Sequence, residues 1–294
     1  MSWGVSEATG GRQPAPAVML GELASCGYTG TELGPLGYLP SDAAGLRDAL
    51  DARGIALVGA FCPVTLHDPG RRAAGIAEAD RIIELLAAAG ASILVLAEAG
   101  DARRKAVAGR VPADGSAGFD ETAWKRFADA ADTIARRAAD HGLVTAFHPH
   151  AATYVETPAE MDALLAHTDP SLVGLCLDTG HAVYGGGDPV AIAHRHATRI
   201  RHVHLKDVRA RVLARAASGE LDFAAAVAAG VFAPLGEGDL DLRATLDALR
   251  DAGYDGWLVV EQDRVIGATD APSAPRNDAA RSFAYLQDAF GGNL

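Results

Sequence analysis

Cysteine is scarce in this 294-residue chain, which contains three, and none of them belongs to a CxxC pair. An odd and dispersed set of cysteines argues against a disulfide framework and is typical of reduced thiols in a cytosolic protein. No apolar run approaches the ~18 residues of a membrane span. The first residues also lack the basic and apolar regions of a secretory signal. These absences predict a soluble cytoplasmic protein with no membrane partner.

Positive charge is also in short supply, because 26 Lys and Arg stand against 38 Asp and Glu, a formal net charge of −12. A protein that binds nucleic acid needs a basic face to meet the phosphates. The acidic balance therefore disfavours a nucleic-acid partner and leaves a small molecule as the expected one. The sequence is compatible with a homo-oligomer.

Several motifs of nucleotide and ester chemistry are missing: there is no GxGxxG after the first apolar run, no P-loop and no GxSxG. Their absence removes support for a dinucleotide-binding fold, a P-loop NTPase or an α/β-hydrolase. Aromatic residues are few, at 6%, whereas apolar residues make up 49% of the chain. Such a composition, rich in Ala and Gly, suits a large core in which helices pack closely on strands.

What the chain does contain is a regular alternation of short apolar runs with stretches of helical periodicity. The runs are Trp3–Ser6, Gly30–Leu33, Ala56–Phe61, Ser92–Ala97, Val144–Phe147, Val173–Leu177, Ile200–Leu205 and Gly256–Val260. Strict alternation of strand and helix implies parallel strands joined by right-handed crossovers. Eight such units, in a length near the ~250 residues typical of the fold, predict a single (β/α)8 TIM barrel over residues 1–294.

Three connections are too long to be simple turns, namely those after the fourth, seventh and eighth predicted strands. They are Glu98–Asp120, Lys206–Leu240 and Ala268–Asn277. In a parallel barrel, the loops that follow strands lie over the carboxyl ends, where the chemistry of such folds takes place. We expect these three loops to shape access to a site.

Side chains of metal-ligand type stand at or just after the ends of the last four runs. They are His150, Asp178, His204 and Glu261. Since the carboxyl ends of barrel strands converge, these two imidazoles and two carboxylates are expected to surround one divalent cation. Mixed N and O ligands suit Mn²⁺ or Co²⁺, with Mg²⁺, Fe²⁺ or Zn²⁺ as alternatives. Each residue also has a structural interpretation: Asp178 as a helix cap, and the histidines of His202-Val203-His204 as core side chains.

Several segments together resemble the xylose-isomerase-like sugar isomerase/epimerase superfamily, and within it most closely the inosose dehydratases of myo-inositol catabolism. They are Glu32–Asp42, Asp178–His181, Gly186–Pro189, His202–Val208, Gly230–Asp239 and Gly256–Asp263. The resemblance implies metal ligands at Asp178, His204 and Glu261. It also implies that His150 takes the place of the glutamate that the epimerases carry after their fifth strand. Glu156 resembles an acid of the family that supports the site, although the dehydratases often have Gln there.

The activity implied by this resemblance is that of a metal-dependent carbon–oxygen lyase. It would dehydrate a cyclic polyol ketone such as 2-keto-myo-inositol through an enolate, after the metal has polarised the ketone. Glu261 or Glu156 is the expected base, and His181 or Lys206 the expected acid or enolate stabiliser.

The alternatives are an isomerase or epimerase of a ketose or inosose on the same scaffold, a non-catalytic sugar-binding barrel, and a subunit of a sugar-deglycosylating complex. An endonuclease of abasic DNA shares this barrel, but the acidic balance disfavours it.

Overall fold

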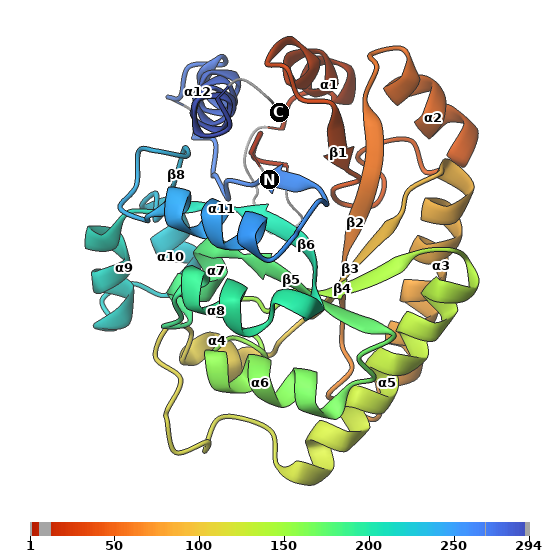
Figure 1. The fold of residues 1–294 in the computed structure, drawn as a ribbon, viewed down its shortest axis with the longest axis vertical. Helices are drawn as coiled ribbons and strands as arrows, with labels where there is room; N and C mark the ends of the chain where they lie inside the picture. The colour runs from red at the N-terminus through yellow and green to blue at the C-terminus, as the bar shows by residue number, and fades with distance from the viewer. Residues whose placement is uncertain (1, 6–12, 268, 292–294) are drawn as a thin grey trace.

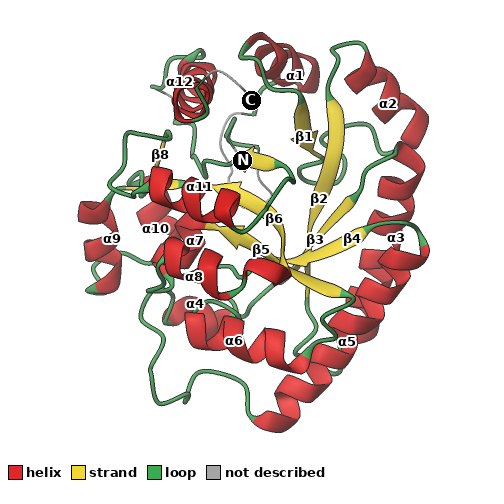
Figure 2. Ribbon diagram, in the orientation of Figure 1, coloured by secondary structure: helices red, strands yellow, loops and turns green. Residues whose placement is uncertain are grey.

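The protein is a nearly closed barrel of parallel strands surrounded by helices, seen in a computed structural model (Figures 1 and 2). The structure describes residues 2–5, 13–267 and 269–291. The predicted TIM-barrel class is confirmed: parallel strands alternate with helices along the chain.

The main sheet has seven strands among the described residues, in the order β1-β2-β3-β4-β5-β6-β9. They are β1 (Gly30–Glu32), β2 (Ala56–Val64), β3 (Ile93–Glu98), β4 (Val144–Phe147), β5 (Val173–Asp178), β6 (Ile200–Leu205) and β9 (Leu258–Val260). A short antiparallel pair, β7 (Asp207–Val208) and β8 (Phe232–Ala233), stands apart from it. The predicted second to eighth strands are all present.

The helices lie mainly on the outside of the barrel (Figure 2). They are α1 (Pro16–Ser25), α2 (Ala43–Asp51), α3 (Arg72–Ala89), α4 (Ala102–Ala106), α5 (Glu121–Asp140), α6 (Pro158–His167), α7 (Thr179–Tyr184), α8 (Pro189–Arg195), the 3₁₀ turn Ala197–Arg199, α9 (Ala210–Ala217), α10 (Phe223–Ala228), α11 (Leu242–Asp251) and α12 (Ala274–Ala289). The long segment after β6 contains β7, α9, α10 and β8.

The predicted first strand, Trp3–Ser6, is not a strand. Residues 2–5 form a turn, and Ser6 lies outside the described residues. The physical reason is at Gly4, whose φ of 68° is far from the negative values that a β-strand requires. The turn still lies against the sheet, since the backbone N–H of Gln262, just after β9, donates to Oγ of Ser2.

Alternation along the strands determines which side chains face the barrel axis. Val95, Ala146 and Cys176 belong to a small cluster inside the barrel. Their neighbours Phe147 and Leu175 belong instead to the large core that also includes helix residues. Because successive side chains point to opposite faces of a sheet, every second residue beyond Ala146 or Cys176 is directed at the mouth of the barrel.

The start of α6 offers a test of local stability. Thr157 and Glu160 form a reciprocal capping box, in which each side chain accepts a hydrogen bond from the backbone of the other residue. Thr157→Ala should lower the free energy of unfolding by about 1 kcal/mol, because it leaves a helix N–H without its acceptor. Urea denaturation measures the change. Thr133→Ala, inside α5, removes the same atoms without a cap, and an equal loss there would contradict this reason.

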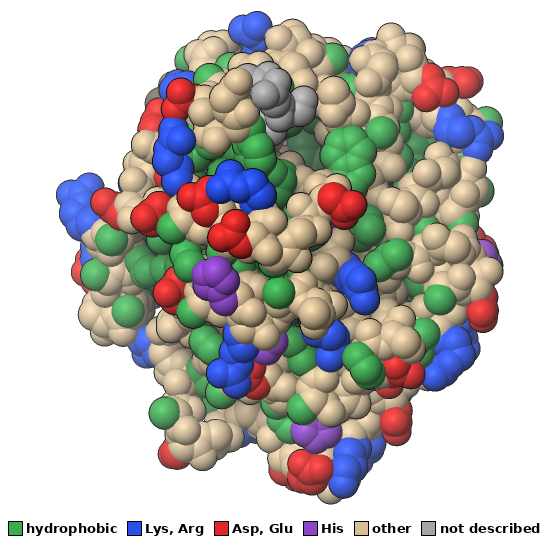
Figure 3. Space-filling view, viewed as in Figure 1, with side chains coloured by type: hydrophobic (Ala, Val, Ile, Leu, Met, Phe, Trp, Pro, Cys, Tyr) green, Lys and Arg blue, Asp and Glu red, His purple; other side chains and the backbone are tan. Residues whose placement is uncertain are grey.

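Acidic and basic side chains are interspersed over the face seen in Figure 3. None of the helices in the described part of the chain combines the length and apolar character needed to cross a bilayer.

Candidate metal centre

Four side chains from consecutive strands of the barrel bring potential ligand atoms within 4.8 Å of one another: His148, Asp178, His204 and Glu261. His148 directly follows β4, Asp178 ends β5, His204 lies on β6, and Glu261 directly follows β9. All four occupy the alternating positions that face the barrel mouth. Three of them, Asp178, His204 and Glu261, belong to the ligand set expected from the sequence.

His148, rather than His150, completes this group, and no candidate ligand group of the described residues includes His150. Since His148 and His150 have the same strand parity, the reason is the point at which the chain leaves the direction of β4. Ala146 faces the barrel interior and Phe147 the outer core, so His148 faces inward again. The chain then leaves the strand direction. Nδ1 of His150 donates to the carbonyl of Ala151, and its ring centre lies 3.7 Å from that of His181.

The hydrogen bonds of His148 determine its tautomer. Nδ1 lies 2.7 Å from the carbonyl oxygen of Pro149, which can only accept, so Nδ1 carries the hydrogen. In the neutral ring, Nε2 is therefore the nitrogen that carries the lone pair, and it lies 3.5 Å from Oδ2 of Asp178. A lone pair that faces a carboxylate oxygen inside a protein is repelled by it unless a cation lies between them.

His204 lies on the other side of the group, and both of its ring nitrogens face carboxylates. Its Nε2 lies 2.8 Å from Oε1 of Glu32, whereas Nδ1 lies 2.9 Å from Oε2 of Glu261 and 3.7 Å from Oδ2 of Asp178. This buried Nδ1 has no geometrically sound hydrogen-bond partner among the described residues. Burial alone would lower the pKa of His204, but Cys176, Glu32 and Glu261 together hold it well above its usual value.

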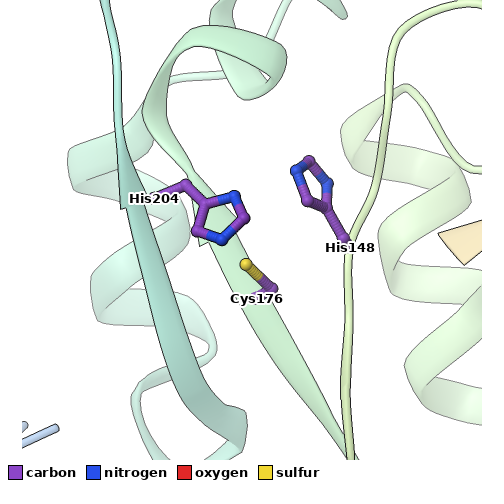
Figure 4. A group of neighbouring side chains, drawn as sticks. All are labelled: His148, Cys176 and His204. Carbon is purple, nitrogen blue, oxygen red and sulfur yellow. The ribbon is translucent and has the colours of Figure 1, made fainter. Parts of the chain in front are cut away.

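Cys176 lies between the two histidines, as Figure 4 shows, and could form an alternative group with them. It pairs with His202 in the sheet register, one layer below the pair of Asp178 and His204. Burial raises the pKa of its thiol. Because metals bind the thiolate, this thiol is a poorer ligand than the two carboxylates above it.

Asp178 serves both of the roles considered for it. Oδ1 accepts the backbone N–H of His181 at 2.7 Å and so caps α7. Oδ2 faces the group and lies 2.7 Å from Nζ of Lys206. Although burial opposes the charged form, Lys206 and His181 hold the pKa of Asp178 well below its usual range. One carboxylate thus joins the start of a helix to the site.

Lys206 is completely buried beside the ligand group. Its Nζ donates to Oδ2 of Asp178 at 2.7 Å and to Oε2 of Glu261 at 2.6 Å. Burial disfavours the ammonium, but Asp178, Asp263 and Glu261 outweigh it and hold the pKa of Lys206 well above its usual value. A lysine that keeps its proton in this way is suited to stabilising negative charge rather than to donating a proton.

His181 and Asp263 form a second pair of polar groups next to Lys206. Nδ1 of His181 accepts the backbone N–H of Ala151 at 3.3 Å, so the neutral ring carries its hydrogen on Nε2. Nε2 lies 3.7 Å from Oδ2 of Asp263. Burial and the neighbouring His150 hold the pKa of His181 well below its usual value. Burial raises the pKa of Asp263 to about 6, against the opposing effect of Lys206.

Glu156 lies apart from this pair and from the ligand group. Its two carboxylate oxygens accept backbone hydrogen bonds from Gly109 at 2.5 Å and Ala152 at 2.7 Å. Burial raises its pKa to about 7 in spite of these bonds. It is not among the described residues that line the large cavity, which extends from the starts of β1 and β9 to the side chains of His148 and Glu261. The geometry suits an acid that holds two loops together.

The cavity itself has a volume of about 1370 Å³. Glu32, His148, His150, Glu261 and Asp263 are among the side chains that line it. Space of this size accommodates a small ligand next to the ligand group. Glu32, His148 and Asp263 were not among the site residues expected from the sequence. Parity from Ala146 would have admitted His148 beside His150, and the acids at the ends of strands were visible signals for Glu32 and Asp263.

The donor set fits a divalent cation. It offers one nitrogen from each of two imidazoles and two carboxylates, and the ammonium of Lys206 bonds to both carboxylates. This mixture of N and O ligands is the type that Mn²⁺, Co²⁺, Fe²⁺ and Zn²⁺ accept. The fold and the site together therefore define a parallel α/β barrel with a candidate metal centre at the carboxyl ends of its strands.

The chain belongs to the xylose isomerase-like TIM barrel family, whose pattern it matches over residues 20–289. It is 33% identical over 276 residues to the inosose dehydratase of Geobacillus thermodenitrificans, an alignment that covers 92% of this chain and 89% of that protein.

The solved structures that share the fold include the following two. One is 3-keto-D-glucoside 4-epimerase from E. coli, with a TM-score of 0.70 and 21% identity over 93% of this chain and 94% of that one. The other is the IOLI protein with a bound zinc atom, with a TM-score of 0.71 and 16% identity over 97% of this chain and 95% of that one.

Proposed function

We propose that this chain is a metal-dependent lyase that removes water from a cyclic polyol ketone, with 2-keto-myo-inositol as the leading candidate. Support for the substrate class comes from the similarity to an inosose dehydratase along 92% of the chain. The observation that carries the proposal is the ligand group, in which β4 contributes a histidine while β5 and β9 contribute carboxylates.

That arrangement favours a lyase over an epimerase for a chemical reason. Epimerisation removes a proton on one face of a carbon and returns one on the other, which suits two opposed carboxylates. In the epimerase pattern, one of these acids follows the strand that corresponds to β4. Here a histidine, His148, directly follows β4, and its Nε2 faces the ligand group.

The chemistry supplied by a divalent ion bound to His148, Asp178, His204 and Glu261 is polarisation of the ketone, which makes the α-proton more acidic. Lys206 faces the negative charge that develops when that proton leaves, because its ammonium is buried at the same point. Glu261 is the proposed base. It lines the cavity, and Lys206 and His204 keep its carboxylate ionised against the effect of burial.

The leaving hydroxyl needs a proton to depart as water. Asp263, whose pKa burial raises to about 6, is the proposed acid in its protonated form, and the neutral ring of His181 lies beside it, with Nε2 at 3.7 Å from Oδ2. Atoms and charge balance in this elimination: the α-proton passes to the base, the carbon–oxygen bond breaks, and the departing hydroxide takes up the proton of the acid. The product is an unsaturated ring ketone, equivalent to a 1,2-dicarbonyl after tautomerisation.

Mass spectrometry of a substrate panel tests the proposal. With Mn²⁺ added, 2-keto-myo-inositol should lose about 18 daltons, the mass of one water, and substrate recovered from D₂O should carry deuterium at the α-carbon. The panel also contains other inososes and free ketohexoses. If ketohexoses epimerise without a change in mass while the inososes stay unaltered, the chain is an isomerase and the lyase assignment is wrong.

A further inference from the structure

Glu32 connects two sides of the barrel mouth that are distant in the sheet order. It is the last residue of β1, and one of its oxygens, Oε1, lies 2.8 Å from Nε2 of His202 and 2.8 Å from Nε2 of His204. Both histidines are on β6 and share its inward face, because they are two residues apart. In the described sheet, β1 pairs with β2 and β6 pairs with β5 and β9. The contact therefore crosses the barrel interior.

A carboxylate oxygen accepts hydrogen bonds, so each Nε2 must carry a hydrogen to make them. This assigns the nitrogens of His204: Nε2 is bound to hydrogen, and Nδ1 faces Glu261 at 2.9 Å. Without Glu32, the neutral ring would gain more by placing its hydrogen on Nδ1, toward Glu261. That tautomer has no lone pair left on the nitrogen that faces the ligand group.

We propose that Glu32 is a positioning residue that holds His204 with hydrogen on Nε2 and thereby presents Nδ1 as the metal-ligating atom. The proposal rests on the metal site of the proposed function and adds a residue outside its ligand set. Carboxylates that accept the second N–H of a ligating histidine orient the ring, and their loss typically weakens metal binding 10–100-fold.

His202 has a supporting part in this arrangement. It is fully buried, it donates to the same oxygen, and its own Nδ1 has no hydrogen-bond partner in the described part of the chain. Two donors on one oxygen restrain the Glu32 carboxylate from two directions. The ring of His204 is restrained in turn, because its Nε2 bonds to that same oxygen.

The test is metal binding by Glu32→Gln, measured by competition with a chelating dye for Mn²⁺, Co²⁺ and Zn²⁺. We expect binding 10–100-fold weaker than in the wild type, since Gln keeps the shape and loses the charge. Glu32→Asp should recover part of the affinity. Glu98→Gln is the matched control: Glu98 also lines the cavity and bonds to a histidine, His67, but lies outside the ligand group. Its metal affinity should stay within about twofold of the wild type.

A spectroscopic reading separates positioning from a general loss of structure. In ¹⁵N-labelled, Zn²⁺-loaded wild type, Nε2–H of His204 should exchange slowly with solvent, and in Glu32→Gln it should exchange quickly. Unchanged metal affinity in Glu32→Gln would overturn the proposal, as would an equal loss in Glu98→Gln. A wild type that binds two metal equivalents, one of which is lost in Glu32→Gln, would make Glu32 a ligand instead. None of these readings uses a substrate, so the reaction assignment can fail independently.

Discussion

Asp178→Asn should abolish metal binding and lower turnover by about a thousand-fold or more, while the fold persists. The two oxygens of Asp178 have separate partners: Oδ1 caps α7 through the N–H of His181, and Oδ2 faces the ligand group. An asparagine oxygen can still cap the helix. It cannot supply the negative charge that a divalent ion and the Lys206 ammonium require. The substitution should therefore reduce metal binding and turnover and leave the helix cap in place.

The measurements are kcat/KM with added Mn²⁺, metal content of the purified protein, and the unfolding temperature. Asp188→Asn provides the matched control, because Asp188 caps α8 by the same type of bond at an exposed position. It should retain both metal and activity. Metal content and turnover near wild-type values in Asp178→Asn would remove Asp178 from the proposed centre.

Variants of the two histidines after β4, His148 and His150, test the same centre. His148→Ala should lose metal as Asp178→Asn does, because the Nε2 lone pair of His148 faces Oδ2 of Asp178. His150→Ala should keep it, because the Nδ1–H of His150 is bonded to Ala151 and the ring packs on His181. The reverse pattern would restore His150 as the ligand inferred from the sequence.

Lys206→Met should lower kcat by about 10²–10³-fold with little change in KM. The reason is that the ammonium is buried between Asp178 and Glu261, where negative charge would develop on the substrate. Methionine fills most of the same space without the charge. Metal binding should be retained or become tighter, since the substitution removes a positive charge that competes for the same two carboxylates.

Steady-state kinetics and dye competition report these two effects separately. Lys105→Met makes the same substitution at an exposed lysine that lines the cavity, and it should leave kcat within a few-fold of the wild type. If Lys206→Met loses its metal, then Lys206 organises the ligands rather than the reaction. If kcat is unchanged, its buried charge has no part in the chemistry.

What the sequence by itself determined is the part of the structure that depends on local and periodic signals. Seven of the eight predicted strands are present, within three residues at either end, because buried parallel strands appear as short apolar runs between helical patterns. The start of α6 at Pro158 follows from Thr157 and Glu160, whose bonds involve only neighbouring backbone. Asp178, His204 and Glu261 were placed together because parallel strands bring their carboxyl ends to one edge.

Only the tertiary structure decided which side-chain atoms contact one another at the carboxyl ends of the strands. His148 and His150 have the same parity, and the choice between them depends on where the chain leaves the β4 direction. Glu32 reaches His202 and His204 across 170 and 172 positions of sequence, a contact that no local pattern encodes. The tautomers follow from such contacts, because a ring nitrogen carries its hydrogen where an acceptor lies. Periodicity in a sequence specifies the face of a strand, whereas the partner on that face depends on how the whole barrel closes.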